Sequence, residues 1–135
     1  MNLNSKPEQR GINSPIDFSS ALERTGGDES FLKELINIYV EDFRKMHPQL
    51  QKAIKEEDFD KIYKLGHSLL GTSATLRLKP LQEASLQLGL AGREGDLRKA
   101  TKSFSIINNE FKRLQDFLIK KGWLKAASVQ RNSDR

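Results

Sequence analysis

The amino-acid sequence predicts an all-α protein, an antiparallel four-helix bundle with a short additional N-terminal helix. Apolar residues recur at steps of three and four along four long stretches of the chain, which is the spacing of one helix face. Alternating runs of β-branched residues, which would indicate strands, are scarce. The links between the apolar stretches are short, so helices that follow one another in the chain are expected to run antiparallel.

Start signals and apolar spacing place the first two helices. The first is predicted over 17–25, between Pro15 and a Gly-Gly pair. Asp28 can cap the second, a long amphipathic helix that runs toward the acidic junction EEDFD at 56–60. Pro48 lies inside that pattern and is expected to bend or split the helix near His47, which is interpreted as a surface residue at the bend.

Three more helices follow from the same signals. Asp58 can cap the third, which runs to about Leu76, and the fourth opens at 79–80 and fades at 92–95. Asp96 can cap the fifth, which runs to about residue 121, where Gly122 stops it and Trp123 can pack against the bundle. The chain is therefore divided into a flexible N-terminal segment at 1–14, the bundle at 15–121 and a basic C-terminal tail at 122–135.

Composition and charge exclude several classes of function. The 135 residues include no cysteine, which removes disulfides, thiolate nucleophiles and cysteine-based zinc sites and fits a reducing compartment. No apolar run approaches the roughly 18–20 residues of a membrane span, and the polar start lacks the core of a secretory signal, so a cytoplasmic protein is expected. The net charge of +5 could indicate nucleic acid, but acidic residues interleave with the basic ones, and no nucleic-acid partner is expected.

His67 is predicted to be exposed in the middle of the third helix. The apolar face of that helix comprises Phe59, Ile62, Leu65, Leu69, Ser73 and Leu76, and His67 lies roughly 150° from its middle. Gly66 points toward the core, where a missing side chain lets a neighbouring helix approach. Gly71 lies on the outer face one turn beyond His67, with Ala74 a turn further, so the imidazole can stand clear. An ordinary surface histidine beside a tolerated glycine remains the alternative.

An isolated, exposed histidine suits few kinds of chemistry. A metal site is not expected, because His47 lies on a different helix and no paired His/Glu pattern accompanies His67. No nucleophile is spaced to form a catalytic set with it. Neutral imidazole is itself a nucleophile near pH 7 and can carry a phosphoryl group. Lys64, one turn back, could offset the phosphate charge.

Several motifs together resemble the histidine-containing phosphotransfer (HPt) domain of multistep two-component phosphorelays. The central one is HSLLGTSATL at 67–76; the internal Pro48 with Leu50, the acidic junction, and the segment with Leu81, Leu88, Arg93, Gly95 and Asp96 extend the resemblance over about 16–121. It implies a four-helix bundle with His67 as the phosphoryl acceptor. The implied function is a carrier, not an enzyme, that exchanges phosphoryl groups with an aspartate of response-regulator receiver domains.

The resemblance also implies the partners and the docking face. The partners would be a receiver domain, a hybrid sensor histidine kinase or both. No cofactor of the chain's own is expected, Mg²⁺ being supplied by the receiver, and a monomer is expected. Leu70, Gly71 and Ala74 would form part of the docking surface, rimmed by Lys64.

Two positions depart from the family pattern. Members usually carry lysine where this chain has Leu70, and a glutamine often found on the next helix is replaced at about Gly89, with Gln87 nearby. Either Lys64 or Arg77 substitutes electrostatically, or transfer is weakened. The alternative function is thus a non-transferring module that binds a receiver domain or a sensor kinase.

Overall fold

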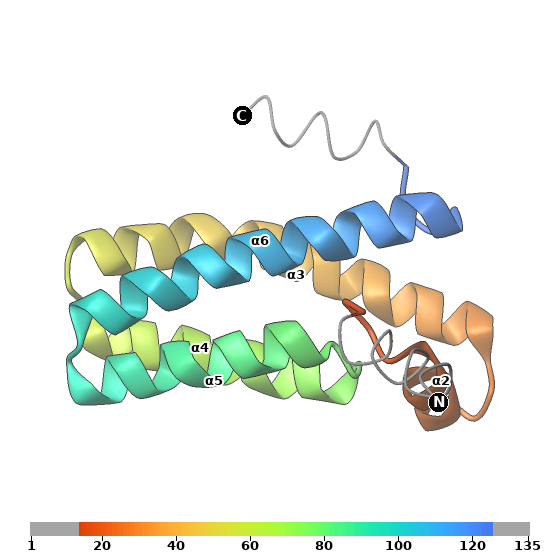
Figure 1. Ribbon diagram of the computed structural model, residues 1–135, viewed down its shortest axis with the longest axis horizontal. Helices are drawn as coiled ribbons and strands as arrows, with labels where there is room; N and C mark the ends of the chain where they lie inside the picture. Colours follow the sequence, from red (N-terminus) through yellow and green to blue (C-terminus); the bar gives the residue numbers. More distant parts are fainter. Residues whose placement is uncertain (1–13, 126–135) are drawn as a thin grey trace, which may run out of the picture.

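The computed structural model describes residues 14–125, and these form five helices and no strand. The helices are α2 (Phe18–Arg24), α3 (Glu29–Lys55), α4 (Phe59–Thr75), α5 (Lys79–Glu94) and α6 (Leu97–Lys121). The four long helices lie side by side, and the short α2 sits at one end of them (Figure 1). The predicted all-α bundle is confirmed. The predicted flexible segment 1–14 lies outside the described residues except for Ser14. The predicted basic tail 122–135 lies outside them except for residues 122–125.

Aspartate caps begin four of the five helices. The carboxylates of Asp17, Asp28, Asp58 and Asp96 accept hydrogen bonds of 3.0–3.2 Å from the backbone N–H three residues on. Each bond satisfies a donor that has no partner within the helix. Asp28, Asp58 and Asp96 are the caps that the sequence predicted. Gly95 and Gly122 close α5 and α6 with φ values of 67° and 82°, which a residue with a side chain adopts at a cost.

Helix α3 is continuous across Pro48, so the proline does not split it. The ribbon instead changes direction near its middle (Figure 1), as expected where a residue without an N–H leaves a carbonyl one turn back unpaired. The interpretation of His47 as a surface residue is wrong. Its ring is half-buried, its Nε2 lies 3.0 Å from Asn108 Oδ1 of α6, and it stacks on Phe104 at 5.2 Å. Because the helix continues, His47 faces α6 instead of a bend.

Helices α4 and α5 pack with their backbones in contact at two glycines. A Cβ added to Gly66 would lie 2.6 Å from the backbone nitrogen of Gly89, and one added to Gly92 would overlap the backbone nitrogen of Tyr63. Gly66 is buried, as predicted. This close approach fixes how the two helices align, and it brings the backbone of α5 against the helix that carries His67.

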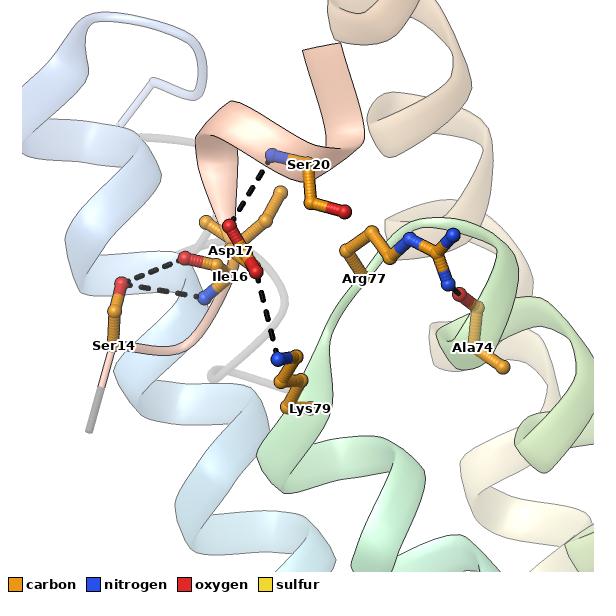
Figure 2. Close-up of polar contacts among 7 residues, drawn as sticks. All are labelled: Ser14, Ile16, Asp17, Ser20, Ala74, Arg77 and Lys79. Carbon is orange, nitrogen blue, oxygen red and sulfur yellow. Dashed lines mark hydrogen bonds and ion pairs between the residues drawn. The ribbon is translucent and has the colours of Figure 1, made fainter. Parts of the chain in front are cut away.

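The N-terminal end of α2 is tied to the turn between α4 and α5 (Figure 2). The Asp17 carboxylate lies 3.5 Å from Lys79 Nζ. The backbone N–H of Asp17 donates to the Arg77 carbonyl at 2.9 Å. At the same end of the bundle, Trp123 packs edge-on against Phe18 with ring centroids 5.4 Å apart. The expected packing role of Trp123 is confirmed.

Candidate functional site around His67

His67 is the ninth of the 17 residues of α4, and its side chain is exposed. The opposite side of the helix is buried, with Ile62, Leu69 and Ser73 at 0–4% exposure. The helical arithmetic that predicted an exposed histidine at mid-helix is therefore confirmed. Within residues 14–125 the His67 ring takes part in no hydrogen bond, so its nitrogens are open to a partner.

The surface beyond His67 is open. Gly71 is exposed, and a Cβ added there would meet nothing within 4 Å. Leu70 and Ala74 are half-buried on either side of it, so that each exposes part of an apolar side chain. The sequence predicted this open surface next to the imidazole. That Leu70, Gly71 and Ala74 dock a partner protein stays a prediction.

Lys64 lies one turn before His67 and is already paired. Its Nζ lies 3.0 Å from Asp60 Oδ2, and both side chains are more than 70% exposed. The hydrogen bond and the negative charge of Asp60 raise the pKa of Lys64, so the ammonium is charged at physiological pH. A fully solvated pair of this kind is weak and can open, which leaves Lys64 able to turn toward an incoming phosphate.

Arg77 does not lie near the histidine. It follows the end of α4, ten residues from His67, which is a rise of about 15 Å along a helix. Its Nη1 lies 3.5 Å from the Ala74 carbonyl (Figure 2), and its Nε is buried without a hydrogen-bond partner among the described residues. The interpretation that Arg77 substitutes for the lysine absent at position 70 is not supported by this placement.

The position of α5 that faces His67 carries no side chain. A Cβ on Gly89 would lie 3.8 Å from the His67 backbone nitrogen, which places residue 89 directly against it. Gln87 is directed elsewhere: its Nε2 donates to Glu83 Oε2 at 3.2 Å, and it lines a groove between α5 and α6. Neither residue places an amide beside the imidazole.

Two residues that the sequence did not mark out as parts of the site lie close to it. The Tyr63 ring stacks on the His67 ring with centroids 5.8 Å apart and planes 21° apart. The Arg93 guanidinium carbon lies 5.4 Å from the centroid of the same tyrosine ring. Tyr63 could have been found by its i, i+4 spacing to His67. Arg93 appeared only as part of a motif, because its place beside Tyr63 depends on how α5 aligns with α4.

The described residues contain no cluster of three or more histidine, aspartate or glutamate side chains that could hold a metal ion. Within the same part of the chain, no helix is both long enough and apolar enough to span a membrane. The site consists of an exposed imidazole, an aromatic ring stacked on it, an arginine and an open, partly apolar surface.

Comparisons with known proteins agree with this description. The model of the family described as "Hpt domain" matches residues 34–117. Multistep phosphorelay regulator 1 of Schizosaccharomyces pombe is 28% identical over 116 residues, an alignment that covers 76% of this chain and 39% of that protein. The chain thus spans about two fifths of the length of this relative. No solved structure matches.

Proposed function

This chain belongs to the Hpt domain family, and we propose that it is a phosphorelay carrier whose acceptor is His67. It takes a phosphoryl group from an aspartate of a response-regulator receiver domain and passes it to another. The observation that carries the proposal is the exposed imidazole at the middle of α4, with open space one turn away at Gly71. A hybrid sensor histidine kinase that contains a receiver domain is an equally suitable donor.

Transfer is a displacement at phosphorus. A ring nitrogen of neutral His67 attacks in line with the bond between phosphorus and the aspartyl oxygen. As the phosphorus–nitrogen bond forms, the phosphorus–oxygen bond breaks, and its electron pair leaves on the aspartate carboxylate. The other ring nitrogen keeps its proton, so no general base is required, and the reverse step regenerates the aspartyl phosphate.

The two proteins contribute differently to this step. Because this chain offers an accessible nucleophile and no cluster of acidic ligands among its described residues, Mg²⁺ and most of the charge stabilisation would come from the receiver. The chain then has no turnover of its own. Its contribution is to hold the imidazole at the middle of a packed helix, where a docked partner meets it in a fixed position.

The docking surface proposed here consists of Leu70, Gly71 and Ala74. Their partly exposed apolar atoms suit the centre of an interface, while the Lys64–Asp60 ion pair lies at its rim. Rim charges of this kind change the association rate and its salt dependence more than the affinity. The surface therefore fits a protein partner with a small apolar patch next to its phosphorylated aspartate.

The test is transfer from a labelled, phosphorylated receiver domain. Wild-type protein should gain an acid-labile, alkali-stable label, and His67→Gln should gain none. The matched control is His47→Gln, because His47 is the chain's other histidine and glutamine can keep its hydrogen bond to Asn108. Equal labelling of wild type and His67→Gln would reject the assignment. Receiver binding that survives His67→Ala, with no label on the wild type, would indicate the non-transferring module instead.

A further inference from the structure

The site as described leaves the charge of a phosphoryl group without an obvious counter-ion. Leu70 and Gly89 carry no charge or hydrogen-bond donor in their side chains, and Arg77 lies near the end of the bundle. Lys64 is paired with Asp60. A phosphohistidine adds roughly two negative charges at neutral pH, and these need compensation from nearby cations or from water.

We infer that Tyr63 and Arg93 act together as positioning residues for His67: Tyr63 orients the imidazole, and Arg93 supplies positive charge beside it. The inference rests on the proposed function, because it concerns the same histidine. Leu70 and Gly89 stand where the family usually has lysine and glutamine, and Tyr63 and Arg93 would take over the roles of those two side chains.

Tyr63 holds the imidazole by its face. The two rings are nearly parallel, so the stacked contact covers one face of His67 and leaves the nitrogens on the ring edge uncovered. An exposed histidine otherwise samples several rotamers. Stacking on a half-buried ring reduces that freedom, so the uncovered ring edge meets an approaching receiver in fewer orientations.

Arg93 is the cation that contacts the Tyr63 ring, and through that ring it lies near His67. The two centroid distances share the tyrosine ring, so the guanidinium carbon lies at most about 11 Å from the His67 centroid, the sum of 5.8 and 5.4 Å. Arg93 is exposed and has no ion pair within residues 14–125, so its N–H groups remain available. A guanidinium resting on an aromatic face can still donate from its edge to phosphate oxygens.

The packing of the two helices builds this arrangement. Gly92 lies so close to the backbone of Tyr63 that any side chain there would overlap it. Arg93 is the next residue of α5, and the same contact therefore sets it beside the Tyr63 ring. The backbone contact places the Cα of Arg93, and the contact with the Tyr63 ring places its guanidinium.

The experiment measures the equilibrium of transfer between a receiver and the intact chain, and the rate at which the small phosphodonor phosphoramidate labels His67. Arg93→Gln should lower the equilibrium constant for transfer to His67 about three- to fourfold at low salt, the effect in water of one charge on a dianion at about 11 Å. Arg93→Lys should stay within twofold of wild type. The control is Arg24→Gln, which removes the same charge from an exposed residue of α2, at the other end of the bundle.

Two further readouts separate positioning from a merely structural role. Raising the salt concentration should shrink the difference between wild type and Arg93→Gln, because screening weakens a charge effect and leaves packing unchanged. Tyr63→Leu should slow labelling by phosphoramidate at least threefold, whereas Tyr63→Phe, which keeps the ring, should not. An Arg93→Gln constant within twofold of wild type, or equal labelling rates for Tyr63→Leu and Tyr63→Phe, would overturn the inference. Absence of any transfer to wild-type His67 would instead reject the proposed function, and the phosphoramidate rates would still test Tyr63.

Discussion

The contact between α4 and α5 predicts opposite effects for one added methyl group at two positions of α4. In Gly66→Ala, the new Cβ would lie 2.6 Å from the backbone nitrogen of Gly89 and 2.9 Å from its Cα. These are backbone atoms of a helix and cannot rotate away. In Gly71→Ala, the new Cβ meets nothing within 4 Å.

The magnitudes follow from packing and helix propensity. Ordinary contacts between such atoms are about 3.5–4.0 Å, so Gly66→Ala requires the two helices to separate by about 1 Å. Overpacking of this kind costs about 1–3 kcal/mol, toward the upper end where backbone must move, against about 1 kcal/mol gained in helix propensity. Gly66→Ala should therefore lose about 1–2 kcal/mol of unfolding free energy. Gly71→Ala should gain up to about 1 kcal/mol.

The assay is urea unfolding followed by far-ultraviolet circular dichroism, with the midpoints of both variants compared at equal slope. Gly89→Ala is a useful third variant: its Cβ would make only ordinary contacts at 3.8–3.9 Å, so it should gain up to about 1 kcal/mol, as Gly71→Ala does. Equal stability of Gly66→Ala and Gly71→Ala, or a loss of stability in Gly71→Ala, would show that the backbone contact between α4 and α5 does not limit residue 66 to glycine.

Three other perturbations have defined outcomes. The buried Tyr39 hydroxyl has no hydrogen-bond partner among the described residues, and burial raises its pKa well above 10.0, so only the unfolded chain ionises it near pH 10. The unfolding free energy should therefore fall by about 1.4 kcal/mol per pH unit above pH 10. Tyr39→Phe should be at least as stable as wild type at pH 7 and should lose this contribution to the pH dependence. The check is the unfolding free energy of both proteins measured at pH 8 and pH 11. Leu70→Lys should lengthen the lifetime of the phosphohistidine or speed its formation; no change in either would mean that the lysine is irrelevant in this chain. Gly71→Phe should fold normally and accept phosphate from phosphoramidate, yet take it slowly from a receiver; unchanged receiver kinetics would show that partners do not approach over Gly71.

Features that depend on one helix at a time could be predicted from the sequence. Asp28, Asp58 and Asp96 mark helix starts because a carboxylate there bonds the N–H three residues on, which is local chemistry. The exposure of His67 and the burial of Gly66 follow from 3.6 residues per turn and one apolar face.

Features that depend on how two helices pack together could not be predicted from the sequence. Predicting that His47 bonds Asn108 requires knowing that α3 continues past Pro48 and how it faces α6, 61 residues along the chain. Placing Arg93 beside Tyr63 requires the alignment that Gly92 imposes on α4 and α5. Arg77 follows the predicted end of the helix near Leu76, but the sequence does not show that its guanidinium lies against the Ala74 carbonyl.

The proposed function requires one side chain, that of His67, to carry the phosphoryl group. Its most direct test maps the modified residue by mass spectrometry after transfer from a receiver, with the peptides kept at alkaline pH to preserve a phosphorus–nitrogen bond. We expect a single phosphoryl group on the peptide that contains His67. A group found on His47, on a hydroxyl or carboxyl side chain, or nowhere on the chain would contradict it.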